Sequence, residues 1–210
     1  MGLVLRGCRA PILLFATGIL LNGCGGLPLG TPRTPPAEYR QKVGLYVDDK
    51  IERFHYFGSA SGDASNKMAF HLQQTLPARI QSMLMSMFES VELSEPNAQI
   101  QFKTPDLAGF FSVRTLTVRY DYPDPNLSVY RAEVEMSVEF RTFEHQPVWS
   151  TVVVGEGAGY DDPNFRLNEF SRGASSALED AYQKAVDDIE DEIYKSQSLK
   201  EYFRGRLLGP

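Results

Sequence analysis

Two long stretches of alternating hydrophobicity, residues 112–122 and 129–143, constrain the fold of this chain more than any other feature. In the second stretch apolar and polar side chains alternate one by one: Val134, Met136, Val138 and Phe140 against Glu133, Glu135, Ser137 and Glu139. Successive side chains of a strand point to opposite faces of a sheet, so the pattern predicts strands with one apolar face. The intervening Pro123-Asp124-Pro125-Asn126 is typical of a turn, and the sequence therefore predicts an antiparallel hairpin.

The charges of this hairpin select its register. Setting Arg119 opposite Arg131 would bring like charges together, and setting Val118 opposite Glu133 would mix the two faces. Pairing Arg119 with Glu133 avoids both faults. It also places Val118 opposite Val134, Leu116 opposite Met136, and Tyr120 opposite Ala132. We therefore expect an exposed Arg119–Glu133 neighbour pair on one face and a continuous apolar surface on the other.

Two amphipathic helices are expected to cover that apolar surface, because each carries an apolar stripe at helical spacing. The first spans residues 66–87 and is kinked at Pro77; its stripe is Ala69, Leu72, Leu76, Ile80, Met83, Leu84 and Met87. The second begins near Asn164; its stripe is Leu167, Phe170, Ala174, Ala177, Leu178, Ala181, Ala185 and Ile189.

Shorter elements complete the expected fold. Strands are predicted at residues 42–47, 90–93, 98–102 and 148–155, and a short helical tail at residues 198–203. One-sided strands need a cover, which the two helices supply. The predicted fold class is therefore α+β, a two-layer sandwich. Its mostly antiparallel sheet is covered on one face by two long amphipathic helices.

The amino-terminal residues carry an export signal. Arg6 and Arg9 precede an uncharged stretch, residues 10–21, which is shorter than the roughly 20 residues of a membrane span and suits a signal peptide. It ends at Leu21-Asn22-Gly23-Cys24, which resembles the lipobox of bacterial lipoproteins. The resemblance implies cleavage before Cys24 and attachment of lipid to the Cys24 thiol. We expect residues 1–23 to be a cleaved signal peptide.

Residues 24–40 follow with three glycines and four prolines, a composition that predicts a semi-extended tether rather than a helix or strand. Residues 41–210 are then expected to form a single periplasmic α+β domain. Loss of Arg6 and Arg9 would leave 19 basic against 27 acidic residues, a net charge of −8. Such a domain repels nucleic acid, and we expect no nucleic-acid partner.

No catalytic, metal or cofactor site is expected. His55, His71 and His145 lack the spacing of metal ligands, and residues 161–164 lack that of a calcium loop. The run of alternating glycines at residues 155–159 lacks the other residues of a phosphate loop and is interpreted as the exit of a strand.

Aromatic residues in predicted connections are the candidates for partner contact: Phe54, Tyr56 and Phe57 in one run, and Phe110 and Phe111 in another. Two interpretations remain open. Exposed aromatic residues dominate interaction hot spots, whereas the same residues can fill the core beneath a loop.

The lipobox, the Pro-rich tether, the β-α-β-β-β-α order and a short Ser-x-x-x-x-Phe-like tail together resemble YajG-type small bacterial lipoproteins. More distantly, the order is similar to the periplasmic α/β domains of CsgG, LpoB and the TolB amino terminus. The resemblance implies no catalytic residue. We expect a non-enzymatic lipoprotein, anchored to the outer membrane through Cys24, whose domain docks on another envelope protein or on its own copies. A subunit of a CsgG-like pore or secretion assembly is the alternative, and an envelope hydrolase is a third.

Overall fold

The computed structural model describes residues 39–48, 51, 55–59, 67–71, 76–94, 100–124, 129–160 and 172–208. All of them belong to one compact unit, Thr34–Pro210. Residues 1–38, which include the expected signal peptide and Cys24, lie outside the described residues.

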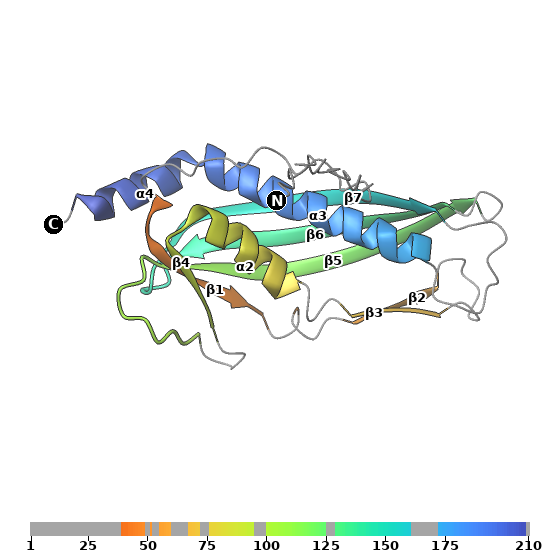
Figure 1. Cartoon of the computed structure of the whole chain (residues 1–210), viewed down its shortest axis with the longest axis horizontal. Helices are drawn as coiled ribbons and strands as arrows, with labels where there is room; N and C mark the ends of the chain where they lie inside the picture. Colours follow the sequence, from red (N-terminus) through yellow and green to blue (C-terminus); the bar gives the residue numbers. More distant parts are fainter. Residues whose placement is uncertain are drawn as a thin grey trace, which may run out of the picture. The chain divides into compact units, whose positions relative to one another are not determined.

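A five-stranded sheet in the order β4-β1-β5-β6-β7 forms the main layer (Figure 1). Its strands are β1 (Lys42–Val47), β4 (Ser90–Leu93), β5 (Phe110–Asp124), β6 (Val129–Arg141) and β7 (Pro147–Tyr160). The three long strands pair antiparallel, whereas β1 runs parallel to both β4 and β5. A second sheet consists of β2 (His55–Ser59) and β3 (Lys67–His71), which pair antiparallel.

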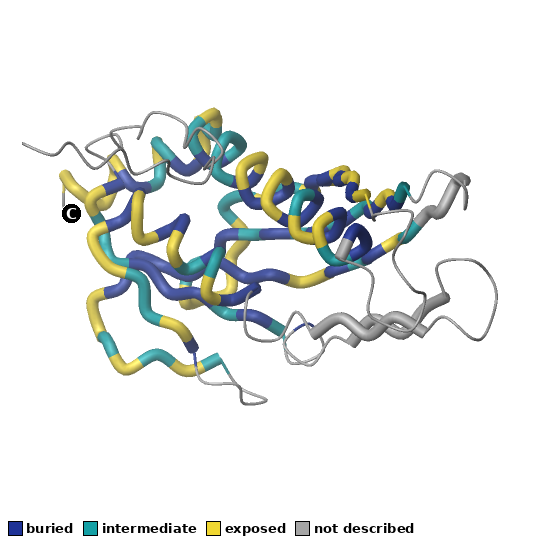
Figure 2. The backbone as a smooth tube through the Cα atoms, turned by 45° about the vertical axis from the view of Figure 1, so that its right-hand side comes forward, coloured by how far each residue is buried: buried dark blue, intermediate teal, exposed yellow. Residues whose placement is uncertain are grey.

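Helices α2 (Leu76–Met87) and α3 (Arg172–Lys195) cover one face of the large sheet, and α4 (Gln197–Leu207) continues from the end of α3 (Figure 1). Along α3 the residues of the expected stripe from Ala174 to Ile189 are buried, and the exposed residues are polar (Figure 2). The predicted two-layer α+β class is therefore confirmed. The predicted helical tail is α4, whose first turn is capped by the Ser196 hydroxyl accepting from the Leu199 N–H.

The predicted hairpin register is confirmed. In β5 and β6, Arg119 lies opposite Glu133, and Val118, Leu116 and Tyr120 lie opposite Val134, Met136 and Ala132. The Arg119 guanidinium donates to the Glu133 carboxylate at 2.7 Å on the exposed face. Val134 and Met136 are fully buried. The apolar face of the hairpin thus packs beneath the helices, as the predicted two-layer fold requires.

The glycines at residues 155–159 continue strand β7, so their interpretation as a strand exit is wrong. A Cβ at Gly157 would lie 2.0 Å from the carbonyl oxygen of Ala177 in α3. The same contact recurs at both ends of the motif, at 1.9 Å, for the pairs Gly155–Ala181 and Gly159–Gly173. Two strand residues advance by about 6.8 Å and four helix residues by about 6 Å, so the two small-residue rows stay in step. The glycines let α3 lie directly on the strand.

The prediction of one kinked helix over residues 66–87 is wrong. Lys67–His71 form strand β3, and α2 begins only at Leu76. Pro77 therefore occupies the first turn of the helix, where its missing N–H has no intrahelical partner to lose. The strand predicted at residues 98–102 is also wrong for Ile100–Phe102, which lie in an irregular segment.

The predicted tether, residues 24–40, extends too far, because Tyr39 belongs to the core of the domain. Its side chain is fully buried, and its hydroxyl donates to the Ile193 carbonyl at 2.8 Å. The ring packs against Phe88 and Phe203 with centroid distances of 5.5 and 5.6 Å. Tyr39 therefore joins the start of the domain to its last two helices.

Candidate interaction surface

The aromatic pair predicted to contact a partner is in the core. Phe110 and Phe111 are 1% and 0% exposed, so their assignment to a contact surface is wrong, and the alternative of core packing holds. The two side chains point to opposite faces of β5. Phe111 packs against Phe140 beneath the helices, at a centroid distance of 4.8 Å.

The other predicted contact residues are not tested. Phe54 and Cys24 lie outside the described residues. Tyr56 and Phe57 lie in strand β2, where only the backbone is described. Their roles in partner contact and lipid attachment remain predictions.

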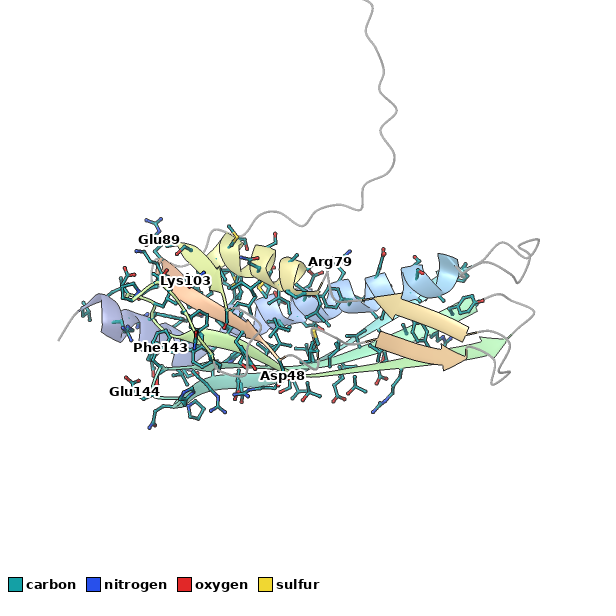
Figure 3. All side chains as sticks on the ribbon, turned by 90° about the horizontal axis from the view of Figure 1, so that it is seen from below. Asp48, Arg79, Glu89, Lys103, Phe143 and Glu144 are labelled. Carbon is teal, nitrogen blue, oxygen red and sulfur yellow. The ribbon has the colours of Figure 1, made fainter. Side chains whose placement is uncertain are left out.

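Phe110 lies on the sheet face opposite the helices, where a local aromatic cluster buries it. Phe102, Phe143 and His145 surround it at centroid distances of 5.7 to 6.0 Å. Gly44 makes room for this cover, because a Cβ there would lie 2.5 Å from the Phe102 ring. Phe143 and Lys103 are seen at the same end of the sheet in Figure 3. The helix-free face is therefore closed at one end by the segment 100–109.

The Glu92 carboxylate holds that segment in place. It accepts from the backbone N–H groups of Lys103 and Thr104. Desolvation raises the pKa of Glu92, but these hydrogen bonds and one from the Thr104 hydroxyl outweigh it, so the net shift is downward. A pocket of about 550 Å³ lies between β4 and the segment, lined by residues 90–93 and 101–104. The Glu92 carboxylate in its lining is already engaged in this structural contact.

A cluster of charged side chains lies on the same helix-free face. Glu139 accepts from both Arg114 and Arg141, the latter at 2.8 Å. Desolvation raises the pKa of Glu139, yet the two arginines outweigh it and hold the pKa below its usual value. Among the described residues, the buried Ser112 Oγ and Arg141 Nε have no hydrogen-bond partner. The cluster ties β5 to β6 near the covered end of this face.

Farther along β7 the helix-free face becomes apolar and exposed. Val152 and Val154 are 62% and 44% exposed. They flank the buried Val153, which faces the helices. On the adjacent strand β6, Val152 lies opposite Ser137 and Val154 lies opposite Glu135. β7 ends the order of the sheet, so no strand of the described residues pairs with its outer backbone edge.

The outer edge of β7 is protected over only part of its length. The Ala158 N–H donates to Asp180, and the Glu156 carbonyl accepts from the Lys184 ammonium at 2.8 Å. Both side chains come from α3. No such contact reaches Ser150, Val152 or Val154 from the described part of the chain. Sequence reasoning recognised this strand and its run of valines, but it could not tell that the strand lies at an edge.

The structure also bears on the histidines and on membrane-spanning helices. The β2–β3 pairing places His55 opposite His71, which their separation in sequence did not suggest. His145 adopts a φ of 61° in the turn between β6 and β7. Within the described ranges, no group of three or more metal-ligating residues occurs. Of the described helices, none has the length and hydropathy needed to span a membrane.

No family model and no curated protein matches this chain. Solved structures with a similar arrangement include a minor lipoprotein from Acinetobacter baumannii, 12% identical with a TM-score of 0.40, covering 77% of this chain and 93% of that one. Another is a protein from Xanthomonas campestris assigned to the DUF330 family, 11% identical with a TM-score of 0.43, covering 84% and 96%. Likenesses at this level carry no argument about activity or partners.

Proposed function

We propose that this protein is a non-catalytic docking domain of the bacterial cell envelope, held at the periplasmic face of the outer membrane by lipid on Cys24. The domain acts as an accessory or assembly factor. It binds a protein partner through the exposed part of β7.

The exposed edge of β7 is the observation that carries the docking role. An unpaired strand edge is a template for another strand, and folded proteins ordinarily protect it. Here α3 protects residues 156 and 158 and leaves the neighbouring valines exposed. Backbone pairing and two apolar side chains together supply both affinity and specificity for an added strand.

Sequence supports the lipid anchor and its address. The charged amino terminus, the apolar stretch of residues 10–21 and Cys24 occur in the order of a lipoprotein signal. Gly25, rather than Asp, follows the cysteine, as in outer-membrane sorting of enteric-type bacteria. Two or more acyl chains would make the attachment effectively permanent.

The described titratable groups support a role without catalysis. The lowered pKa values of Glu92, Glu139 and Asp106 each have a structural partner: backbone amides, two arginines and Lys42, respectively. Burial raises the pKa of Tyr182, whose hydroxyl donates to the Leu76 carbonyl. Each of these groups ties two elements of the fold together.

Two measurements test the proposal. Cys24→Ala should abolish labelling by a fatty-acid analogue and leave the precursor uncleaved, whereas Cys8→Ala should change neither. For docking, a photo-reactive amino acid at Val154 should give a discrete adduct in intact cells. The same amino acid at Asp187, an exposed position of α3, should give none. A chain that stays unlabelled, or a Val154 probe that captures nothing, would contradict the anchor or the docking role.

A further inference from the structure

We propose that the strand added to β7 is a basic, extended segment of a different protein, in which apolar side chains alternate with Lys or Arg. Its apolar side chains contact Val152 and Val154, and its cations face the carboxylates of α3. This inference rests on the proposed docking function and specifies the chemistry of the partner.

The backbone of β7 offers three residues for pairing. The Ala158 N–H and the Glu156 carbonyl both point away from β6, toward α3 side chains. In an antiparallel ladder the N–H and C=O of one residue point the same way, and every second residue repeats this direction. Ser150, Val152 and Val154 therefore direct their backbone groups outward. A register shift lies near the start of β7, so the regular outer ladder ends at Ser150.

A row of charged α3 side chains runs beside this ladder. Asp180 and Lys184, four residues apart in the helix, contact β7 backbone groups that are two residues apart in the strand. Four helix residues advance by about 6 Å and two strand residues by about 6.8 Å. Asp188 and Glu192 continue the row in the same steps, which brings them beside the two exposed valines. An added strand therefore runs along both carboxylates.

This side of α3 carries more negative than positive charge. Lys184 pairs with Asp180 at 2.9 Å, and Lys195 is shared by two carboxylates at 3.3 and 3.9 Å. Asp187 and Asp188 are exposed and form no ion pair with any residue that the structure describes. A second copy would bring like charges together here, whereas a basic segment would neutralise them.

The helix-free face adds negative charge at one end of the ladder. Glu156 is exposed and lies two residues beyond Val154, and Glu135 lies opposite Val154 on β6. Within the described ranges, neither carboxylate forms an ion pair. At the other end, Glu139 lies opposite Ser150 and is already paired with two arginines. The cations of the partner therefore belong beside the valines rather than beside Ser150.

The alternation of the partner follows from antiparallel pairing, which is the more stable arrangement. A residue opposite Val152 or Val154 shares its helix-free face, so an apolar side chain fits there. The same residue directs its N–H and C=O toward β7. Residues opposite Thr151 and Val153 point to the helix face, where a Lys or Arg side chain reaches Asp188. The fitting segment is therefore apolar-basic-apolar-basic.

A synthetic peptide tests this chemistry. The probe is Thr-Val-Lys-Val-Lys-Thr with blocked ends and a neutral fluorophore. The full-length chain, purified in detergent from a host that processes lipoproteins, should bind it saturably by fluorescence anisotropy. Replacing both lysines of the peptide with glutamates should abolish binding. N-methylation of both valines should also abolish it, because their N–H groups pair with β7. N-methylation of both lysines, whose N–H groups point away, should change the dissociation constant by less than about threefold.

Variants of the chain locate the binding site. Asp188→Asn should raise the dissociation constant of the peptide about two- to fivefold, and added salt should reduce the difference. Glu179→Gln is the matched control and should have no effect. It removes the same charge one turn from Gln183, on the side of α3 that contacts Arg79 of α2. Val152→Lys places a like charge in the ladder and should raise the constant at least about tenfold. Because Val152 is 62% exposed, this variant should melt like wild type, which shows that it folds.

No saturable binding, equal binding of the lysine and glutamate peptides, or equal effects of Asp188→Asn and Glu179→Gln would overturn this inference. The Val154 photo-adduct separates that failure from failure of the proposed function. An adduct with a second copy, or with a protein segment that has no basic residues, refutes the basic partner and leaves the docking role intact. The absence of any adduct refutes both.

Discussion

The two faces of the large sheet are built from the same strands, but they are stabilised in different ways. The helix-covered face is continuous and apolar: Phe111, Val134 and Met136 are at most 1% exposed. The opposite face is divided into an aromatic cluster, the charge cluster of Glu139, and the exposed valines of β7. The covered face stabilises the fold, whereas the helix-free face leaves the valines of β7 exposed for contact with other molecules.

The largest contrast should come from truncating one apolar side chain on each face. Phe111→Ala removes a fully buried ring and should lower the free energy of unfolding by about 3–5 kcal/mol. Val154→Ala shortens a side chain that is 44% exposed and should stay within about 0.5 kcal/mol of wild type. Urea unfolding followed by circular dichroism measures both. Equal losses would show that the β7 valines are covered by a part of the chain not described.

A smaller loss should follow from disturbing the contact between α3 and β7. Gly157→Ala places a Cβ 2.0 Å from a backbone oxygen, so helix and strand must move apart. Overpacking of this kind costs about 1–3 kcal/mol. The neighbouring Ala158→Ser, which points to the helix-free face, should have almost no effect. A neutral Gly157→Ala would mean that α3 does not lie directly on the strand.

The charge cluster on the helix-free face should contribute less, and its contribution should depend on pH. Because folding lowers the pKa of Glu139, its stabilisation is present above the ordinary value of 4.5 and is lost as the pH falls through the lowered value. Glu139→Gln should cost about 1 kcal/mol near neutral pH and flatten the loss of stability in acid. Glu135→Gln is the control on the same strand and face. The free energy of unfolding of both variants is measured as the pH is lowered. If the two variants lose stability in the same way, Glu139 has no such role.

The smallest effect is expected at the exposed ion pair of the hairpin. Arg119→Ala should cost about 0.2–1 kcal/mol, and added salt should reduce the difference because the pair is solvated. The Arg119 side chain is 65% exposed. Unfolding at low and high salt checks this expectation. A loss as large as that of Gly157→Ala would erase the distinction between the two faces.

The sequence by itself determined the features that depend on neighbouring residues and on simple pairing. Alternation defined the apolar face of β6, and the charges of Arg119, Arg131 and Glu133 selected the hairpin register, because both act between adjacent strands. The stripe from Ala174 to Ile189 likewise determined which side of α3 is buried. The identity of Cys24 as a lipid site also comes from local pattern alone, and it stays a prediction.

Only the tertiary structure decided where those elements stand relative to one another. It inserted β1 between β4 and β5 in parallel, buried Tyr39, and placed Phe110 beneath Phe102 and Phe143. It also set the Gly155–Gly159 row against α3 and left Val152 and Val154 on an edge. These outcomes depend on contacts between residues far apart in the chain. The sequence around an apolar residue does not show which distant residue will cover it. For the same reason, an aromatic pair suited to a partner proved to be core, and a plain run of valines became the candidate surface.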